Sequence, residues 1–253
     1  MRLLLTVLIA ILPLLAHGGS LADLEIFDRT VGQPLTLHQY QGRLYVAGEP
    51  GHRYELHIRS RSSQRLLAVT SVDGVNVVSG ETAATDQRGY VLDGWTAVTI
   101  EGWRKSLEDV ATFYFTSLAD SYAARTGRPD DIGVIGVAVF AEQTSRHCCQ
   151  YLEEQRAESA TDASGPNAAA RANAGPMVHE ADKPRLGTGH GEREASPAQY
   201  VDFRRASATA DETIVIYYDS RRNLVSQGVL PGHTRLVKQQ PNPFPAGFVP
   251  DPE

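Results

Sequence analysis

The chain has 253 residues, a formal net charge of −6 at pH 7, 21% charged residues and only two cysteines. This length allows one large β domain, or one domain with an appendage. Because acidic and basic residues are intermixed and the balance is acidic, these numbers argue against a protein that binds nucleic acid.

Residues 1–19 have the pattern of a signal peptide. A single cation, Arg2, precedes an apolar run from Leu3 to Leu15, and small residues follow it. The run is shorter than the roughly 20 residues that a spanning helix needs, so an uncleaved membrane anchor is the weaker alternative. We therefore expect a periplasmic or secreted protein with no membrane span once the signal is removed.

Residues 20–140 are predicted to form the main β-sandwich. Short apolar or alternating runs recur about every ten residues, with Gly, Asp and Ser at the breaks between them. The predicted strands are 35–39, 43–47, 54–59, 66–72, 75–78, 89–92, 97–103, 111–116 and 132–140. This rhythm indicates an all-β fold, an antiparallel β-sandwich that is jelly-roll-like. The insert 117–131 breaks the rhythm and predicts a short helix between Ala119 and Arg125.

The pair Asp73-Gly74 lies between two apolar runs and predicts a two-residue hairpin turn with positive φ at both positions. The alternative is a cation site that combines Asp73 with the oxygens of Asn76, Ser79 and Glu81. A hairpin would carry Ser79 and Glu81 away from the turn, so we favour the turn. On that interpretation an Asp73→Asn variant should be nearly silent.

Residues 141–195 are rich in Ala, Gly, Pro and charge, and they predict a flexible low-complexity linker. The linker contains the adjacent pair Cys148 and Cys149, which cannot easily bond to each other. The sequence leaves open an intermolecular disulfide through Cys148 or Cys149, a soft-metal site with His147, or two ordinary thiols.

Residues 196–231 are predicted to form a β unit that docks on the sandwich, with strands at 199–206, 213–220 and 224–230. Three strands are too few for an independent core, which is why this unit should share the core of the sandwich. Residues 232–253 contain repeated prolines and predict an extended tail.

Two segments contain candidate binding residues. Trp103, Arg104 and Lys105 place an aromatic ring beside two cations at a strand end, a combination suited to an anionic or carbohydrate partner. Arg125 belongs to the helical insert at the same predicted end of the sandwich. His190 lies in the glycine-rich string 186–194, which suits either a ligand loop or a flexible return from the linker.

The chain contains four distinctive strings: "VTSVDGVNVVSGETA", "GYVLDGWTAVTIEGWRKS", "DSYAARTGRPDDIGVIGVAVF" and the later "IVIYYDSRRNLVSQGV". Taken together, they resemble a group of uncharacterised secreted proteins of Gram-negative bacteria. The resemblance covers most of residues 54–140 and 186–230. It implies an exported bacterial protein and carries no catalytic residues and no cofactor.

We expect an exported, non-enzymatic β-sandwich that binds a protein or an envelope polymer. The spacing of histidines and acids matches no catalytic or metal motif, and we expect no cofactor. One alternative is an extracytoplasmic hydrolase or metal-dependent enzyme that uses His190 with Asp73, Glu81 or Arg104. Another is a structural envelope component that assembles through its strand edges.

Overall fold

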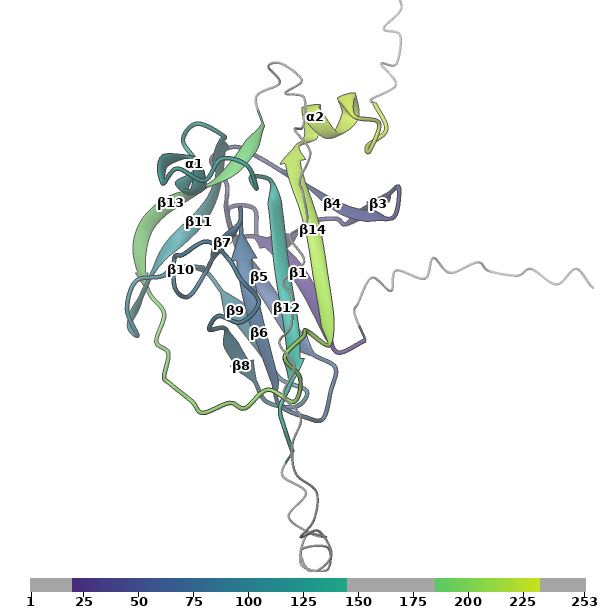
Figure 1. Cartoon of the computed structure of the whole chain (residues 1–253). Helices are drawn as coiled ribbons and strands as arrows, with labels where there is room; N and C mark the ends of the chain where they lie inside the picture. The colour runs from purple at the N-terminus through teal and green to yellow at the C-terminus, as the bar shows by residue number, and fades with distance from the viewer. Residues whose placement is uncertain (1–19, 145–184, 233–253) are drawn as a thin grey trace, which may run out of the picture.

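The computed structural model describes residues 20–144 and 185–232 (Figure 1). Within these ranges the protein is a sandwich of two seven-stranded sheets, with two short helices at one end. The prediction of an all-β sandwich is confirmed. The predicted signal peptide, Cys148 and Cys149, and all but the first residue of the predicted tail lie outside the described residues.

Sheet A has the order β10-β11-β5-β1-β2, with β13 beside β11 and β9 beside β5. All of its pairings are antiparallel. Its strands are β1 (Ala22–Asp28), β2 (Gln33–Pro34), β5 (Arg53–Ser60), β9 (Ala97–Ile100), β10 (Gly102–Arg104), β11 (Asp109–Ser117) and β13 (Leu186–Ala195). The sequence did not predict β1, which pairs with β5 along its whole length.

Sheet B has the order β3-β4-β14-β12-β6-β7, with β8 beside β6. Its strands are β3 (His38–Tyr40), β4 (Arg43–Gly48), β6 (Leu66–Val72), β7 (Val75–Asn76), β8 (Tyr90–Leu92), β12 (Val134–Ala141) and β14 (Glu212–Ser220). The pairing of β14 with β4 is parallel, so this sheet is mixed where a purely antiparallel one was predicted.

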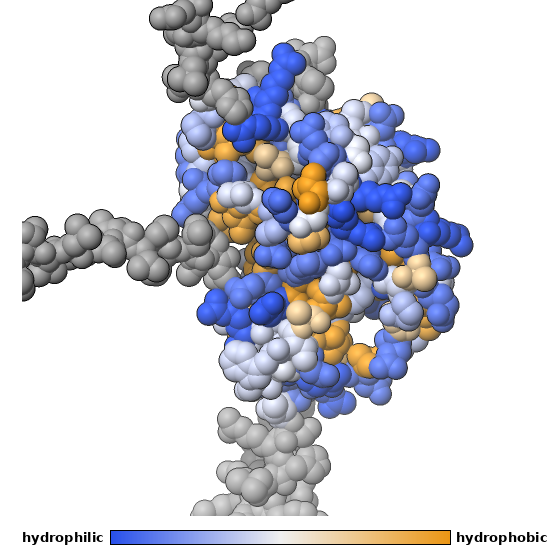
Figure 2. Space-filling model, turned by 180° about the vertical axis from the view of Figure 1, so that it is seen from behind, coloured by the Kyte–Doolittle hydropathy of each residue, from blue (hydrophilic) through white to orange (hydrophobic). Residues whose placement is uncertain are grey.

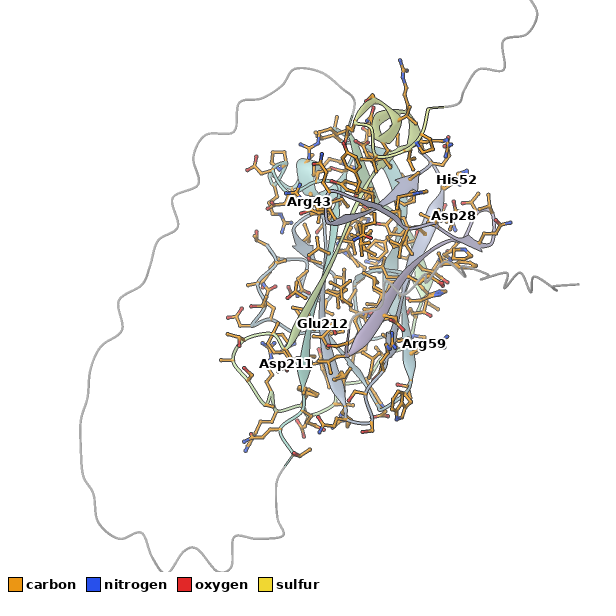
Figure 3. The ribbon with its side chains drawn as sticks, turned by 90° about the vertical axis from the view of Figure 1, so that its right-hand side faces the viewer. Asp28, Arg43, His52, Arg59, Asp211 and Glu212 are labelled. Atoms are coloured by element: carbon orange, nitrogen blue, oxygen red, sulfur yellow. The ribbon has the colours of Figure 1, made fainter. Side chains whose placement is uncertain are left out.

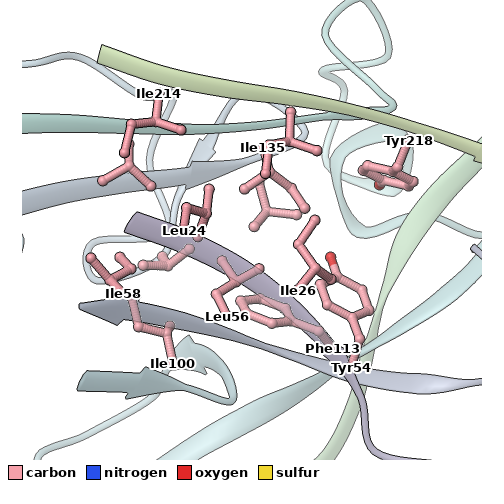
Figure 4. Packing of buried hydrophobic residues seen from close by; sticks show 14 of the residues in the cluster. Leu24, Ile26, Tyr54, Leu56, Ile58, Ile100, Phe113, Ile135, Ile214 and Tyr218 are labelled. Carbon is pink, nitrogen blue, oxygen red and sulfur yellow. The ribbon is translucent and has the colours of Figure 1, made fainter. Parts of the chain in front are cut away.

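The core lies between the two sheets (Figure 4). Leu24, Leu56 and Ile58 of sheet A face Ile135 and Ile214 of sheet B, and all five side chains are buried. Alternation along each strand produces this layer, because every second side chain of a strand points to the same face. Burial of each such side chain stabilises the fold by about 1.5 to 3 kcal/mol.

The predicted turn at Asp73-Gly74 is confirmed. Both residues have positive φ angles, 51° for Asp73 and 69° for Gly74, and β6 pairs with β7 on either side of them. Asp73 is also fully buried. The turn therefore lies in the interior of the protein, which the sequence did not indicate.

Two boundaries of the predicted organisation are wrong. Residues 186–195 are not linker, because they form β13 and pair with β11 along nearly its full length. Of the predicted docking unit only one strand forms, β14, and it lies inside sheet B between β4 and β12. Residues 199–206 form no regular strand, and the expected strand 224–230 is replaced by helix α2 (Arg221–Ser226) and the turn after it.

Helix α1 (Tyr122–Arg125) confirms the helical insert. Ser121 caps it by accepting a hydrogen bond from the backbone N–H of Ala124, and Gly127 follows it with a positive φ angle of 77°. Both described helices are too short to cross a bilayer. Helix α1 packs against β13 and brings that part of the insert to the predicted site.

Candidate functional site

The candidate site is centred on His190, which lies on β13 at the edge of sheet A and is half-buried. Its imidazole lies beside two aromatic rings. The ring centroid of Tyr122 from α1 is 5.3 Å away, and that of Trp103 from β10 is 6.2 Å away and nearly parallel. Three elements that are distant in the sequence therefore meet at this histidine.

Glycines on both sides of His190 allow β13 to lie close to its neighbours. A Cβ atom on Gly189 would overlap the ring of Tyr114, and one on Gly187 would lie 2.6 Å from the Cβ of Ser121. The glycine-rich string is thus a packing feature of a strand, not a flexible loop. This packing fixes the position of His190 against α1.

Three cations surround this histidine. Burial lowers the pKa of His190, and the charges of Lys105, Arg125 and Arg193 lower it further, while a backbone hydrogen bond opposes them. Within residues 20–144 and 185–232, none of these three cations forms an ion pair or a side-chain hydrogen bond. We call Lys105, Tyr122, Arg125, His190 and Arg193 the His190 surface.

The structure brings together four of the five predicted site residues. Lys105 and Arg125 are exposed beside His190, whereas Trp103 is 2% exposed and supports the histidine from below. Trp103 also contacts the ring of Phe113 edge-on, with 4.8 Å between the centroids. Trp103 is therefore a core residue that positions the surface, not an exposed stacking platform.

Arg104 does not belong to this surface, which corrects the prediction. Its guanidinium donates a 2.9 Å hydrogen bond to the hydroxyl of Tyr90 and another hydrogen bond to the carbonyl oxygen of Ser196. It also lies over the ring of Tyr90. Neighbouring residues of a strand point to opposite faces, so Arg104 points away from Lys105 and Trp103.

Sequence reasoning missed Tyr122 and Arg193. Tyr122 belongs to the predicted insert, but nothing in the sequence shows that the insert covers His190. Arg193 was assigned to the linker, because β13 has few apolar residues and many glycines. Only the pairing of β13 with β11 brings Arg193 to this end of the sandwich.

Within residues 20–144 and 185–232, no carboxylate contacts His190 as the acidic partner of the enzyme alternative would. Asp73, the partner proposed for His190 in the enzyme alternative, is bonded elsewhere in the interior. No carboxylate forms an ion pair with the His190 ring within the described ranges. The same residues contain no group of three or more metal-ligating side chains close enough to hold an ion.

Asp73 instead forms a buried network that joins the two sheets. Its Oδ1 accepts hydrogen bonds from the hydroxyl of Tyr218, at 2.6 Å, and from the N–H of Gly133, at 2.9 Å. Its Oδ2 accepts a 2.8 Å hydrogen bond from the N–H of Thr188 on β13. The hydroxyl of Thr188 lies 2.6 Å from those of Tyr218 and Tyr54, which extends the network to β5.

Burial raises the pKa of Asp73 to about 6, and the hydrogen bonds from Tyr218, Gly133 and Thr188 oppose that rise. A second carboxylate, Asp219, accepts hydrogen bonds from the N–H of Leu186 and from the side chain of Asn223. Both aspartates therefore bond to the start of β13. By accepting backbone N–H groups of Leu186 and Thr188, they hold β13 against sheet B, which is a structural role.

A third candidate is the pair of Asp28 and His52 (Figure 3). The Nδ1 of His52 lies 2.8 Å from the Oδ2 of Asp28, and the other carboxylate oxygen accepts the backbone N–H groups of Thr30 and Val31. No hydroxyl or thiol contacts the other ring nitrogen of His52 among the described residues. The pair fixes the loop after β1, and it has no nucleophile to activate.

The outer surface of sheet A has charges of both signs in contact. Arg29 and Arg53 each bind Glu194, at 2.7 and 2.9 Å, while Arg29 also binds Glu55 and Arg53 also binds Glu192. We call these five residues the paired face. The view from behind, in Figure 2, shows a largely hydrophilic surface with scattered hydrophobic patches.

Comparison of the chain with models of known protein families, with curated proteins and with solved structures found no match.

Proposed function

We propose that the protein is an exported, non-enzymatic β-sandwich that binds an anionic partner, a protein or an envelope polymer, through the His190 surface. The observation that supports this proposal is the set of three cations without ion-pair partners among the described residues, gathered around a histidine and a tyrosine. Arginine and lysine pair with carboxylate, sulfate or phosphate groups, and Tyr122 adds a ring for apolar contact.

The local charge differs from that of the whole chain. The formal net charge is −6, and yet the charges that act on His190 are all positive. A concentrated positive patch on an acidic protein attracts anions to one place and repels them elsewhere. This contrast favours a specific partner over general adhesion to polyanions.

Binding of fluorescent dextran sulfate at several salt concentrations tests the proposal. The double variant Arg125→Gln/Arg193→Gln should bind about tenfold more weakly, and the slope of log Kd against log salt should fall by about 1 to 2. The control Arg59→Gln/Arg204→Gln removes the same charge from exposed arginines elsewhere. An equal loss in the control, or no binding by the parent, would contradict the proposal.

Export has a separate test. The exported protein should begin near residue 20, and terminal sequencing of the protein recovered from the periplasm or the medium measures this. A chain that still begins at Met1 would support the membrane-anchor alternative.

A further inference from the structure

A second aromatic surface lies on the outer face of sheet B, at the edge formed by β3, β4 and β14. The ring centroids of Tyr45 and Tyr217 are 5.6 Å apart, and those of Tyr45 and Tyr40 are 6.5 Å apart. All three side chains are half-buried. We call Tyr40, Tyr45 and Tyr217 the tyrosine platform.

Strand register creates this platform. Tyr45 of β4 lies beside Tyr217 of β14 on one side and beside His38 of β3 on the other. Val46 and Ile216, which follow and precede these tyrosines, point into the core and are fully buried. The rings are therefore held on the outer face by alternation within strands whose other face is fixed.

Two cations border the platform. The guanidinium carbon of Arg43 lies 5.3 Å from the ring centroid of Tyr217, and Arg43 is exposed. Burial lowers the pKa of His38, and the nearby charge of Arg221 lowers it further. Neither arginine forms an ion pair within the part of the chain that the structure describes.

A hollow of about 180 Å³ continues the same face of sheet B. Ser71 and Gly136 line it. Gly136 of β12 pairs with Ser71 of β6 on one side and with Val215 of β14 on the other, and Val215 lies two residues before Tyr217. Thr85 and Thr213 add hydroxyl groups to its wall. The hollow and the platform thus lie on the same outer face of sheet B, and Thr213 of the hollow lies four residues before Tyr217 on β14.

We propose that the tyrosine platform binds an acidic polysaccharide whose sugars carry carboxylates. One face of a sugar ring is apolar and packs on a tyrosine ring, while its hydroxyls bond to the polar groups around it. Arg43 and Arg221 complement the carboxylates, which makes an acidic chain a better ligand than a neutral one. A nucleic acid is disfavoured, because two cations on an acidic protein cannot neutralise a phosphate backbone.

This site is separate from the His190 surface, so the two proposals can fail independently. Tyr217 and Arg43 belong to sheet B, whereas His190 lies on β13 of sheet A. Arg59, on β5 of sheet A, provides an exposed control cation, and Figure 3 shows it well separated from Arg43.

Calorimetric titration of the full exported chain with oligogalacturonate tests the inference, with galacto-oligosaccharide of the same length as the neutral ligand. The parent should bind the acidic oligosaccharide more tightly. Tyr217→Thr should weaken binding of the acidic oligosaccharide about tenfold or more, whereas Tyr217→Phe, which keeps the ring, should retain it. Arg43→Gln should reduce the preference for the acidic ligand, and Arg59→Gln should leave it unchanged.

Four results would overturn the inference. The first is that the parent binds neither oligosaccharide, and the second is that Tyr217→Thr and Tyr217→Phe bind the acidic oligosaccharide with the same affinity. The third is that binding is lost in Arg125→Gln/Arg193→Gln but kept in Tyr217→Thr. The last is tighter binding of a single-stranded oligonucleotide that depends on Tyr217. Matching thermal melts of the two Tyr217 variants would show that the comparison reports on the ring and not on folding.

Discussion

The paired face and the His190 surface use the same kinds of residue in opposite ways. On the paired face, Arg29 and Arg53 contact glutamates of the same chain. On the His190 surface, Lys105, Arg125 and Arg193 have no such partner among the described residues. Strand β13 contributes to both, through Glu192 and Glu194 on one and Arg193 on the other. Charge alone therefore does not mark a binding site, whereas charge that the fold leaves uncompensated does.

The greatest loss of stability is expected from a substitution at a glycine of β13. In a Gly187→Ala variant the new methyl group would lie 2.6 Å from the Cβ of Ser121 and 3.0 Å from a methyl group of Ile132, both buried. This should lower the free energy of unfolding by about 3 kcal/mol and shift α1 relative to β13. Urea denaturation measures the loss. Gly136→Ala is the control, because its methyl group would meet only the hydroxyl of Ser71, at 3.0 Å. Equal stability of the two variants would mean that β13 does not need its glycine there.

A smaller loss is expected from Asp73→Asn, about 2 kcal/mol at pH 7, because the amide N–H₂ would oppose a donor such as the N–H of Thr188. This revises the expectation from sequence that the change is silent. The folded pKa of Asp73 is about 6 and its ordinary value is 3.8, so its contribution to stability is complete below pH 3.8 and is lost as pH rises through 6. The difference in the free energy of unfolding between the parent and the variant should therefore be larger at pH 5 than at pH 7.

Urea denaturation of both proteins at pH 5 and pH 7 measures this gap. A gap that stays constant, or that narrows at pH 5, would be inconsistent with a raised pKa of Asp73.

The paired face can be converted into an unpaired one. Glu194→Gln removes the charge that Arg29 and Arg53 share, and it should lower the free energy of unfolding by no more than about 1 kcal/mol. The variant should bind dextran sulfate more tightly than the parent, since two cations lose their partner. If affinity does not rise in the same salt titration, pairing is not what separates the two surfaces.

The smallest effect is expected at Arg104. Because Tyr90 and Ser196 hold its guanidinium away from His190, Arg104→Gln should leave the affinity for dextran sulfate unchanged. A loss as large as that of Arg125→Gln/Arg193→Gln would show that Arg104 belongs to the site after all.

The sequence predicted most of the sheets, because alternating and apolar runs determine which residues a strand buries. It did not predict β13, because glycine is uncommon in strands. The glycines of β13 are explained by the fold, since the side chains of Tyr114 and Ser121 lie too close for a Cβ atom at Gly189 or Gly187. It also missed α2, where Ser220 caps the helix through the N–H of Asn223. Residues of the site were recognised one by one, but their meeting depends on the β11–β13 pairing, which is a long-range contact.

The pKa of His190, followed by NMR of its ring, reports whether an anion binds at the His190 surface. In the free protein it should lie below the ordinary value of 6.5, because of burial and the three neighbouring cations. Saturation with a short dextran sulfate oligomer should raise it, since the anion offsets the charges of Lys105, Arg125 and Arg193. An unchanged pKa of His190 in the presence of bound oligomer would show that the anion binds elsewhere and that the His190 surface is not the binding site.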